Sequence, residues 1–100
     1  MSSEFRTLNI AIEFARQCRV VKAPQYLKEQ LDRSSSSVAL NLAEGSAKGS
    51  RLDRYRFYRI ALGSFRETET TLKIIGANTG QLEETRRKLA GHITNLCKSQ

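Results

Sequence analysis

The chain has 100 residues, of which 39% are hydrophobic and 27% are charged, and these proportions are typical of a soluble globular protein. Its length allows a single domain, residues 1–100, with a core of modest size. Six glycines and one proline exclude a collagenous chain and a proline-rich disordered chain. The 17 basic and 10 acidic residues give a net charge of +7, which favours an anionic partner.

The sequence does not have the pattern of a secreted or membrane protein. No basic segment precedes an apolar one near the N-terminus, and no apolar run approaches the roughly 18 residues of a membrane span. We therefore expect a cytoplasmic protein without a membrane partner, with Cys18 and Cys97 reduced. Two cysteines and one histidine are too few for a four-ligand zinc site within one chain. No metal or other cofactor is expected.

The first predicted helix spans residues 3–21. Its apolar residues recur three or four positions apart, as one face of an α-helix requires. This spacing places one set of side chains in the core: Phe5, Leu8, Ile12 and Ala15, with Ile10, Phe14 and Val21 widening the face. Pro24, the single proline, then fits the first turn of a second helix, where its missing N–H group costs nothing.

The second predicted helix crosses four consecutive serines, residues 34–37. Serine runs are typical of linkers, and each serine costs about 0.5 kcal/mol of helix propensity relative to alanine. However, Leu31 and Val38 keep the apolar period in phase across the run. We therefore interpret the serines as small helical residues that let another helix approach closely. Residues 45–49, with a glycine at each end, are interpreted as the turn that follows.

The last two predicted helices span residues 51–77 and 81–98. Ser50 is placed as the N-cap of the third helix. Residues 78–80 are predicted to form a turn in which Gly80 supplies a positive φ angle. The fourth helix presents a row of leucines at sevenfold spacing: Leu82, Leu89 and Leu96. Four amphipathic helices joined by short turns predict an all-α, antiparallel up-down four-helix bundle.

One side of the third predicted helix is cationic and the opposite side is mostly apolar. At about 100° per residue, five cations form one stripe: Arg51, Arg56, Arg59, Arg66 and Lys73. The opposite arc is predicted to face the core: Phe57, Ile60, Ala61, Ser64, Thr68, Leu72 and Ile75. Tyr58, Leu62 and Phe65 widen that arc, which indicates either an oligomer interface or partial exposure at the bundle edge. Gly63 is predicted to allow close packing against the serines of residues 34–37.

Most of the net charge lies near the start of the third helix. Residues 48–66 contain six basic residues and one acidic residue, a balance of +5. Lysine and arginine neutralise phosphates, and Tyr55 and Tyr58 can stack on unpaired bases. Alternatively, the cations form a solvated face, pair with acidic residues, or meet an acidic protein or membrane surface. The candidate nucleic-acid-binding residues are Lys48, Arg51, Arg54, Arg56, Arg59, Arg66 and Lys73.

No pattern in the sequence favours catalysis. A di-iron bundle needs Glu-x-x-His pairs, but His92 is the single histidine and Leu89 stands three residues before it. The glycines of residues 45–49 do not have the spacing of a phosphate-binding loop. Glu67 and the other polar residues on the packing faces are interpreted as structural. We therefore expect a protein that is not an enzyme.

Two sequence blocks resemble a known bacterial family. Residues 33–45 read Arg-Ser-Ser-Ser-Ser-Val-Ala-Leu-Asn-Leu-Ala-Glu-Gly, and residues 56–72 contain Ala-Leu-Gly-Ser followed by Glu67. This pairing is similar to the four-helix-bundle proteins encoded by intervening sequences in large-subunit ribosomal RNA genes. The positions that match the family pattern are Arg33, Ser37, Asn41, Glu44, Gly63, Ser64 and Glu67.

The resemblance implies an up-down four-helix bundle that assembles as a ring or barrel, a homopentamer. Related bundle proteins accompany the reverse transcriptases of diversity-generating retroelements, where a basic barrel binds nucleic acid and the polymerase. The leading hypothesis is therefore a non-catalytic basic scaffold that binds structured RNA or DNA through the third helix. The alternative is an adaptor for a protein partner, such as a reverse transcriptase. The polar residues expected to be structural are Arg33, Ser37, Asn41, Glu44, Ser64 and Glu67.

Overall fold

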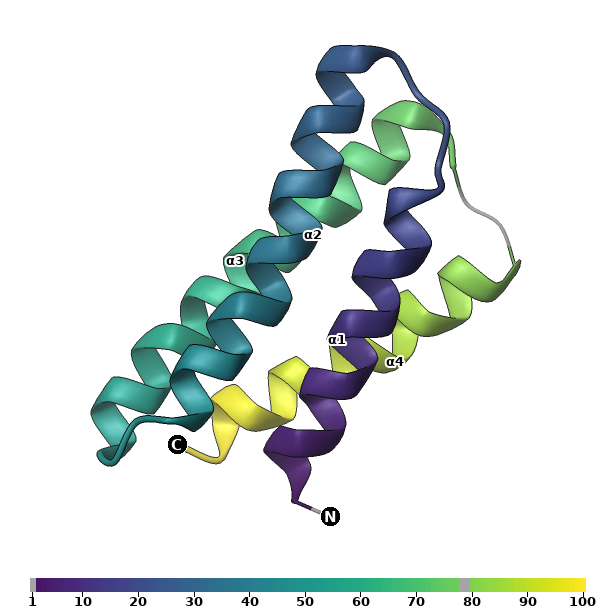
Figure 1. The fold of residues 1–100 in the computed structure, drawn as a ribbon. Coiled ribbons are helices and arrows are strands. Elements are labelled where there is room, and N and C mark those ends of the chain that lie inside the picture. Colours follow the sequence, from purple (N-terminus) through teal and green to yellow (C-terminus); the bar gives the residue numbers. More distant parts are fainter. Residues whose placement is uncertain (1, 78–79) are drawn as a thin grey trace.

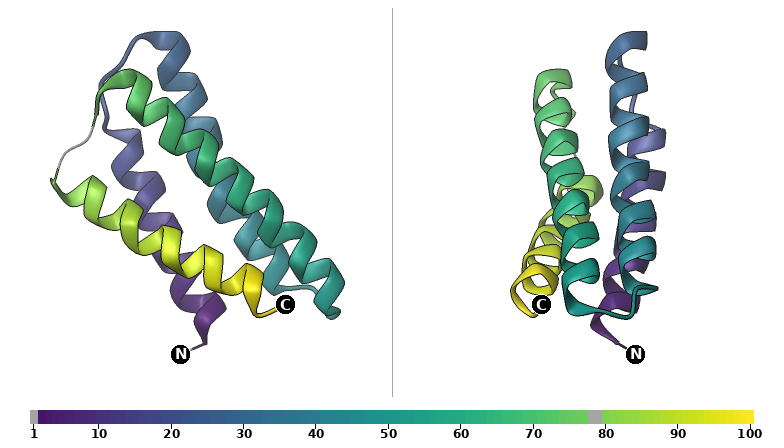
Figure 2. Two further views of the ribbon diagram at one scale, coloured as in Figure 1. Left: turned by 180° about the vertical axis from the view of Figure 1, so that it is seen from behind. Right: turned by 90° about the vertical axis from the view of Figure 1, so that its left-hand side faces the viewer.

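The computed structural model describes residues 2–77 and 80–100. These residues form four α-helices, α1 (Ser3–Arg19), α2 (Gln25–Ser46), α3 (Arg51–Ile75) and α4 (Gly80–Lys98), and no β-strand. The helices run alternately up and down (Figure 1), with α1 and α2 in one layer and α3 and α4 in the other (Figure 2). The predicted all-α four-helix bundle is confirmed. None of the described helices is both long and apolar enough to cross a membrane.

Helix α1 has a different buried face from the predicted one. Its buried residues follow a 4-3-4 spacing: Thr7, Ala11, Phe14 and Cys18. Phe5 and Ile12, predicted to be buried, are 53% and 37% exposed. The buried face combines one aromatic ring, Phe14, with the small side chains of Ala11 and Cys18. Its fourth member is Thr7, whose hydroxyl donates to the Ser3 carbonyl oxygen at 2.7 Å. Side-chain size was therefore a poor guide to the buried face of this helix.

Helix α2 continues through the serine run, as predicted, and packs closely against α3. Ser34 and Ser35 are buried. The hydroxyl oxygens of Ser34 and Thr68 lie 2.8 Å apart, and so do those of Ser37 and Ser64. The hydroxyl of Ser35 donates instead to the Asp32 carbonyl oxygen of the same helix, at 3.4 Å. Because each of these hydroxyls has a partner, the polar cost of burying it is offset.

The predicted turn at residues 45–49 starts too early. Helix α2 runs to Ser46, and Gly45 is helical and buried. A Cβ atom on Gly45 would lie 2.7 Å from Cε1 of Tyr58. This glycine therefore lets α3 approach α2. That role was predicted for Gly63. A Cβ on Gly63 would meet nothing within 4 Å, so that assignment was wrong.

Helix α3 is rotated about its axis relative to the predicted orientation. Tyr58, Leu62 and Phe65 are buried, and the Phe65 ring centroid lies 5.6 Å from that of Phe14. Ile60, predicted to be buried, is 51% exposed. The apolar residues of α3 cover a wider arc of the helix than the core can bury. The part of this arc that is buried is the part nearer to the cationic residues. The oligomer argument based on Tyr58, Leu62 and Phe65 therefore does not hold.

The start of α3 and the buried face of α4 agree with the prediction, whereas the end of α3 differs from it. Ser50 caps α3 as predicted, since its Oγ accepts a hydrogen bond of 3.1 Å from the Asp53 N–H group. The helix ends at Gly76, which has the positive φ angle of 82° that was predicted for Gly80. Gly80 instead begins α4, and the predicted turn residues 78 and 79 lie outside the described residues. The predicted leucine row of α4 is buried.

Candidate nucleic-acid interface

The exposed cations of α3 lie along one side of the helix, away from α2. We call Arg56, Arg59, Arg66 and Lys73 the cationic face; all four side chains belong to exposed residues. Arg59, Arg66 and Lys73 are seven residues apart, or about two turns, so they form a row along α3. Within residues 2–77 and 80–100, none of these three forms an ion pair.

The guanidinium of Arg59 lies over an aromatic ring. Its central carbon is 6.0 Å from the centroid of Tyr55, which is itself 39% exposed. Arg56 makes a long contact of 3.6 Å with Asp53 on an exposed surface, where ion pairs contribute little. Both arginines therefore keep donor groups for a ligand.

The cations near the start of α3 contact the protein itself. Arg54 donates from Nε to the side chain of Gln100 at 2.9 Å and from Nη1 to the Gly49 carbonyl oxygen at 3.1 Å. Arg51 donates from Nε to the backbone oxygen of Gln100 at 3.1 Å. Lys48 pairs with Glu44 at 3.0 Å. Arg51 and Arg54 tie the start of α3 to the end of the chain, and Lys48 pairs with the end of α2, so the donors of all three candidate residues are partly occupied.

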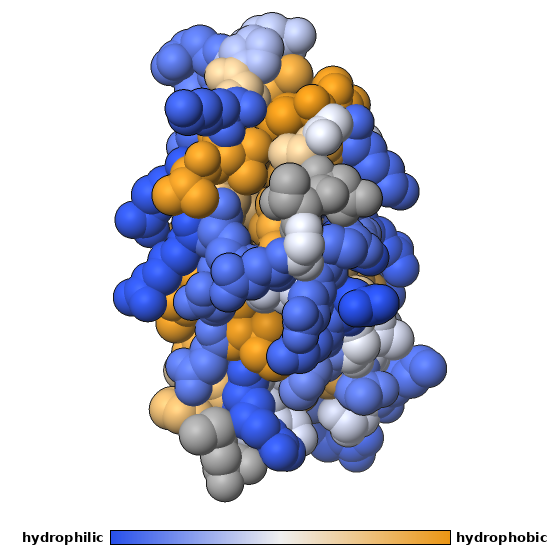
Figure 3. Space-filling view, turned by 90° about the vertical axis from the view of Figure 1, so that its right-hand side faces the viewer, coloured by the Kyte–Doolittle hydropathy of each residue, from blue (hydrophilic) through white to orange (hydrophobic). Residues whose placement is uncertain are grey.

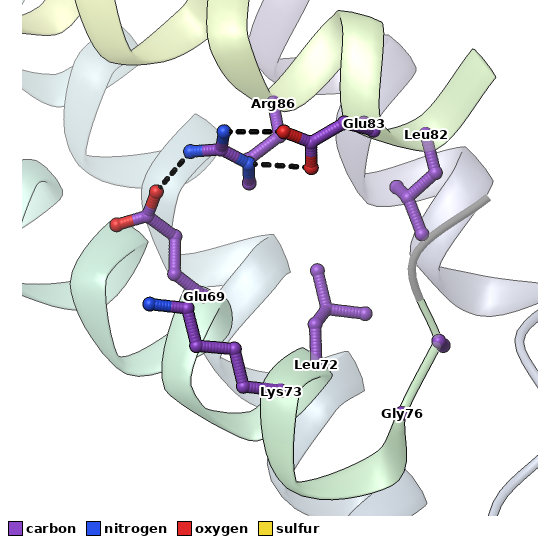
Figure 4. A pocket seen from close by; sticks show the side chains of 8 residues that line it. Glu69, Leu72, Lys73, Gly76, Leu82, Glu83 and Arg86 are labelled. Carbon is purple, nitrogen blue, oxygen red and sulfur yellow. Dashed lines mark hydrogen bonds and ion pairs between the residues drawn. The ribbon is translucent and has the colours of Figure 1, made fainter. Parts of the chain in front are cut away.

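Lys73 differs from the arginines because it lines a pocket between α3 and α4. The pocket has a volume of about 340 Å³, and its apolar walls include Leu72 and Leu82. Arg86 crosses it, held by Glu69 and Glu83 (Figure 4). Hydrogen bonding to Arg86 lowers the pKa of Glu83, so this carboxylate stays ionised. With two carboxylates around one guanidinium, the pocket offers no free anion site at Arg86.

A half-buried thiol lies close to the cationic face. Cys97 on α4 has a pKa raised by burial, an effect that the positive charges of Arg59 and Arg66 partly oppose. This opposing effect places the end of α4 beside the middle of the cationic face. Cys18 lies in the core, and neither cysteine forms a disulfide. No group of three or more potential metal ligands occurs in the part of the chain that the structure describes.

The polar family-pattern residues join α2 to α3. Arg33 Nη2 lies 2.6 Å from Glu67 Oε2, on the exposed side of the two helices. Ser37 contacts Ser64, and Asn41 donates back to the Ser37 carbonyl oxygen at 2.9 Å. Glu44 contacts Lys48 rather than α3. The side chains of the Arg33–Glu67 pair are 62% and 42% exposed, so this pair lies at the surface of the bundle.

The burial of Tyr58 and an apolar depression on the surface were not predicted from the sequence. Tyr58 was grouped with Tyr55 as a stacking residue, but its side chain is buried, and burial raises the pKa of its hydroxyl.

The second feature is an apolar depression of about 330 Å³ between the end of α1 and the start of α4, lined in part by Val20 and Leu82. Figure 3 shows hydrophobic residues gathered at this end of the molecule. The apolar pair Val20-Val21 before Pro24 was the available sequence signal; Val20 is 78% exposed, and Val21 is partly buried.

The fold and the exposed cations define a small basic four-helix-bundle protein. The model of the family described as 23S rRNA-intervening sequence protein matches residues 4–99. Because the match covers nearly the whole chain, the protein belongs to this family. The family predicted from the two sequence blocks is therefore confirmed.

A solved structure has the same fold. It is a crystal structure of a protein with unknown function from the S23 ribosomal protein family of Bacteroides thetaiotaomicron VPI-5482. The two chains are 21% identical with a TM-score of 0.62, and the match covers 98% of this chain and 94% of the other. No curated protein matches the sequence.

Proposed function

We propose that the protein is a non-catalytic, cytoplasmic scaffold that binds structured RNA or DNA through the cationic face of α3. The observation that carries this proposal is the row formed by Arg59, Arg66 and Lys73, which is exposed and lacks acidic partners among the described residues. A row of exposed cations can neutralise several backbone phosphates at once, and it releases counterions when it binds. The net charge of +7 adds long-range attraction.

The test is fluorescence anisotropy of labelled RNA and DNA across a salt series, with the wild type and an Arg59→Glu, Arg66→Glu variant. We expect a steep fall of log K with log salt in the wild type, with a slope smaller by about 2 in the variant. An Arg16→Glu, Arg19→Glu variant is the matched control, because these exposed cations on α1 give the same change in net charge. Equal losses in both variants, or no binding by the wild type, would contradict the proposal.

We also propose that the scaffold is a homo-oligomer, built through the exposed side of the α2–α3 pair. Residues seven apart on α2 are Tyr26, Arg33 and Leu40, and residues seven apart on α3 are Ile60, Glu67 and Ile74. The Arg33–Glu67 pair joins these two rows. In the antiparallel register that this pair sets, Leu40 lies level with Ile60, and the two are 68% and 51% exposed.

Apolar side chains on both sides of an ion pair are typical of a surface that another protein chain covers. The family resemblance implies a pentamer. Sedimentation equilibrium gives the mass directly, and a Leu40→Glu, Ile60→Glu variant should sediment as a monomer with unchanged helix content. A wild-type protein that remains monomeric at high concentration would contradict this part of the proposal.

The alternative partner for the cationic face is an acidic protein surface, such as that of a reverse transcriptase. The exposed side chains of Leu52 and Tyr55 favour it, because apolar groups beside cations suit a protein interface. A specific complex that survives nuclease treatment, with no binding to nucleic acid alone, would support this adaptor function over the scaffold.

A further inference from the structure

The start of α3 lies close to the C-terminus in Figure 1, and an open pocket is lined by residues of both. It has a volume of about 390 Å³ and is lined by Arg51, Leu52, Tyr55 and Gln100. Leu52 is 70% exposed, so the wall contains an apolar side chain as well as the Tyr55 ring. Pockets of this size that combine apolar and aromatic side chains with a few polar groups are typical of sites for small ligands.

Two guanidinium groups flank the Tyr55 ring. Arg59, one turn further along α3, lies 6.0 Å from the ring centroid and continues into the cationic face. Arg51, one turn before, is held at the pocket wall by its hydrogen bonds to the backbone oxygen of Gln100. The pocket therefore combines an exposed aromatic surface with positive charge on either side of it. A ligand that fits has a planar aromatic group and a phosphate attached to it.

We propose that this pocket binds the base of an unpaired nucleotide in an RNA strand, stacked on Tyr55, with the adjoining phosphate at Arg59. This inference rests on the proposed function and specifies its ligand. Bases of a duplex are stacked inside the helix and cannot reach a pocket on a convex protein surface. RNA loops and bulges present such bases unstacked, and stacking on aromatic side chains contributes to their binding.

Tyr55 is the tyrosine suited to this role. Tyr58, its neighbour in the sequence, is buried in the core. Tyr26 on α2 is 68% exposed, but it belongs to the α2–α3 side that carries Arg33 and Leu40 and lies outside the pocket. Phe5 on α1 is 53% exposed and lies outside both the pocket and the α2–α3 side, so it provides the control for an exposed aromatic side chain.

The experiment compares a short labelled single-stranded RNA with a blunt RNA duplex of the same sequence, both measured by anisotropy at one fixed salt concentration. For Tyr55→Leu we expect single-strand affinity to fall about five- to fiftyfold and duplex affinity to change less than about twofold. Tyr55→Phe keeps the ring and should bind as the wild type does. Phe5→Leu should leave both affinities unchanged. Circular dichroism of each variant confirms that the bundle is intact.

The outcomes separate the two proposals. If Tyr55→Leu leaves single-strand affinity unchanged, or weakens both ligands equally, the base pocket is refuted. In that case, loss of both affinities in the Arg59→Glu, Arg66→Glu variant would still support the scaffold. If the wild type binds neither RNA, the scaffold and the base pocket are both refuted.

Discussion

Gly45 and Gly63 are both helical glycines, yet they have opposite surroundings. An alanine at Gly45 would push its Cβ against Tyr58, at 2.7 Å from Cε1, and against Cβ of Phe57 at 3.0 Å. We expect Gly45→Ala to lower the free energy of unfolding by about 1–2 kcal/mol, because overpacking exceeds the gain in helix propensity. Gly63→Ala meets open space and should raise it by up to about 1 kcal/mol.

Urea denaturation of the two variants and the wild type measures both effects. The variants are each other's control, since both replace a glycine by alanine within a helix. If Gly45→Ala were as stable as the wild type, the α2–α3 distance would not be set by this contact. If Gly63→Ala were destabilised, the side of α3 near the cationic face would be covered by something other than solvent.

Cys18 should make stability depend on pH under alkaline conditions. Burial raises the pKa of its thiol from 9.0 to about 12. The folded protein therefore keeps the thiol protonated while the unfolded chain loses the proton near pH 9. The contribution is fully present below pH 9 and is lost as pH rises from 9 towards 12, at about 1.4 kcal/mol per pH unit.

Urea denaturation at about pH 8 and about pH 10 measures this dependence, and Cys18→Ala should show a smaller decrease between the two. The comparison concerns the change with pH, because removing a core side chain also lowers stability at every pH. Tyr58 adds a decrease of the same sign only above its ordinary pKa of 10.0. An equal decrease in the wild type and the variant would show that Cys18 is not the group responsible.

At the scale of the helices, α4 is held least firmly at its start. The α2–α3 interface is the most extensive in the bundle, and the α3–α4 interface is the smallest. The pocket of about 340 Å³ separates the start of α4 from the end of α3, with Arg86 bridging to Glu69. We expect hydrogen exchange of the first turns of α4 to be faster than that of the middle of α2 and α3.

Mass spectrometry of deuterated peptides measures this exchange. Arg86→Leu should speed it further, because Glu69 and Glu83 then face each other without the guanidinium between them. Lys88→Leu on the same helix is the control, since Lys88 contacts only Glu84, at 3.6 Å on an exposed surface. Equal protection of all four helices would indicate that the bundle opens only as a whole.

The helices differed in how well the sequence predicted them. The buried faces of α2 and α4 were predictable, because most of their apolar residues follow one helical period. Leu40, which falls outside that period, is exposed. In α1 and α3 the apolar residues spread around more of the helix, and packing decided which part was buried. Phe5 and Ile60 therefore lie at the surface, while Thr7 and Tyr58 are buried. Helical spacing alone contains no information about which neighbour a helix meets.

The candidate site, like the helices, was only partly predictable from the sequence. The row of cations follows from spacing within one helix, so it could be found in the sequence. The contacts of Arg51 and Arg54 with Gln100 could not, because they join positions more than 40 residues apart. The pocket beside Tyr55 depends on the same meeting of helix ends. Features that arise where distant segments meet required the structure.

At the scale of the whole molecule, the positive charge that favours an anionic ligand also repels itself. The net charge is +7, and Arg59→Glu with Arg66→Glu lowers it to +3, because each exchange removes one positive and adds one negative charge. Neither arginine forms an ion pair within the described part of the chain. We therefore expect the variant to be at least as stable as the wild type at low salt, although the proposed function predicts that it binds nucleic acid more weakly.

Thermal unfolding across a salt series measures this stability difference. It should shrink as salt is added, because the screening length is about 10 Å at 0.1 M and about 3 Å at 1 M. An Arg59→Gln, Arg66→Gln variant, with a net charge of +5, should be intermediate. A large loss of stability in the charge-reversed variant would mean that these arginines stabilise the fold, and its loss of binding would then say nothing about a ligand. Gain of stability with loss of binding indicates instead that the cationic face exists for its partner, because it weakens the isolated bundle.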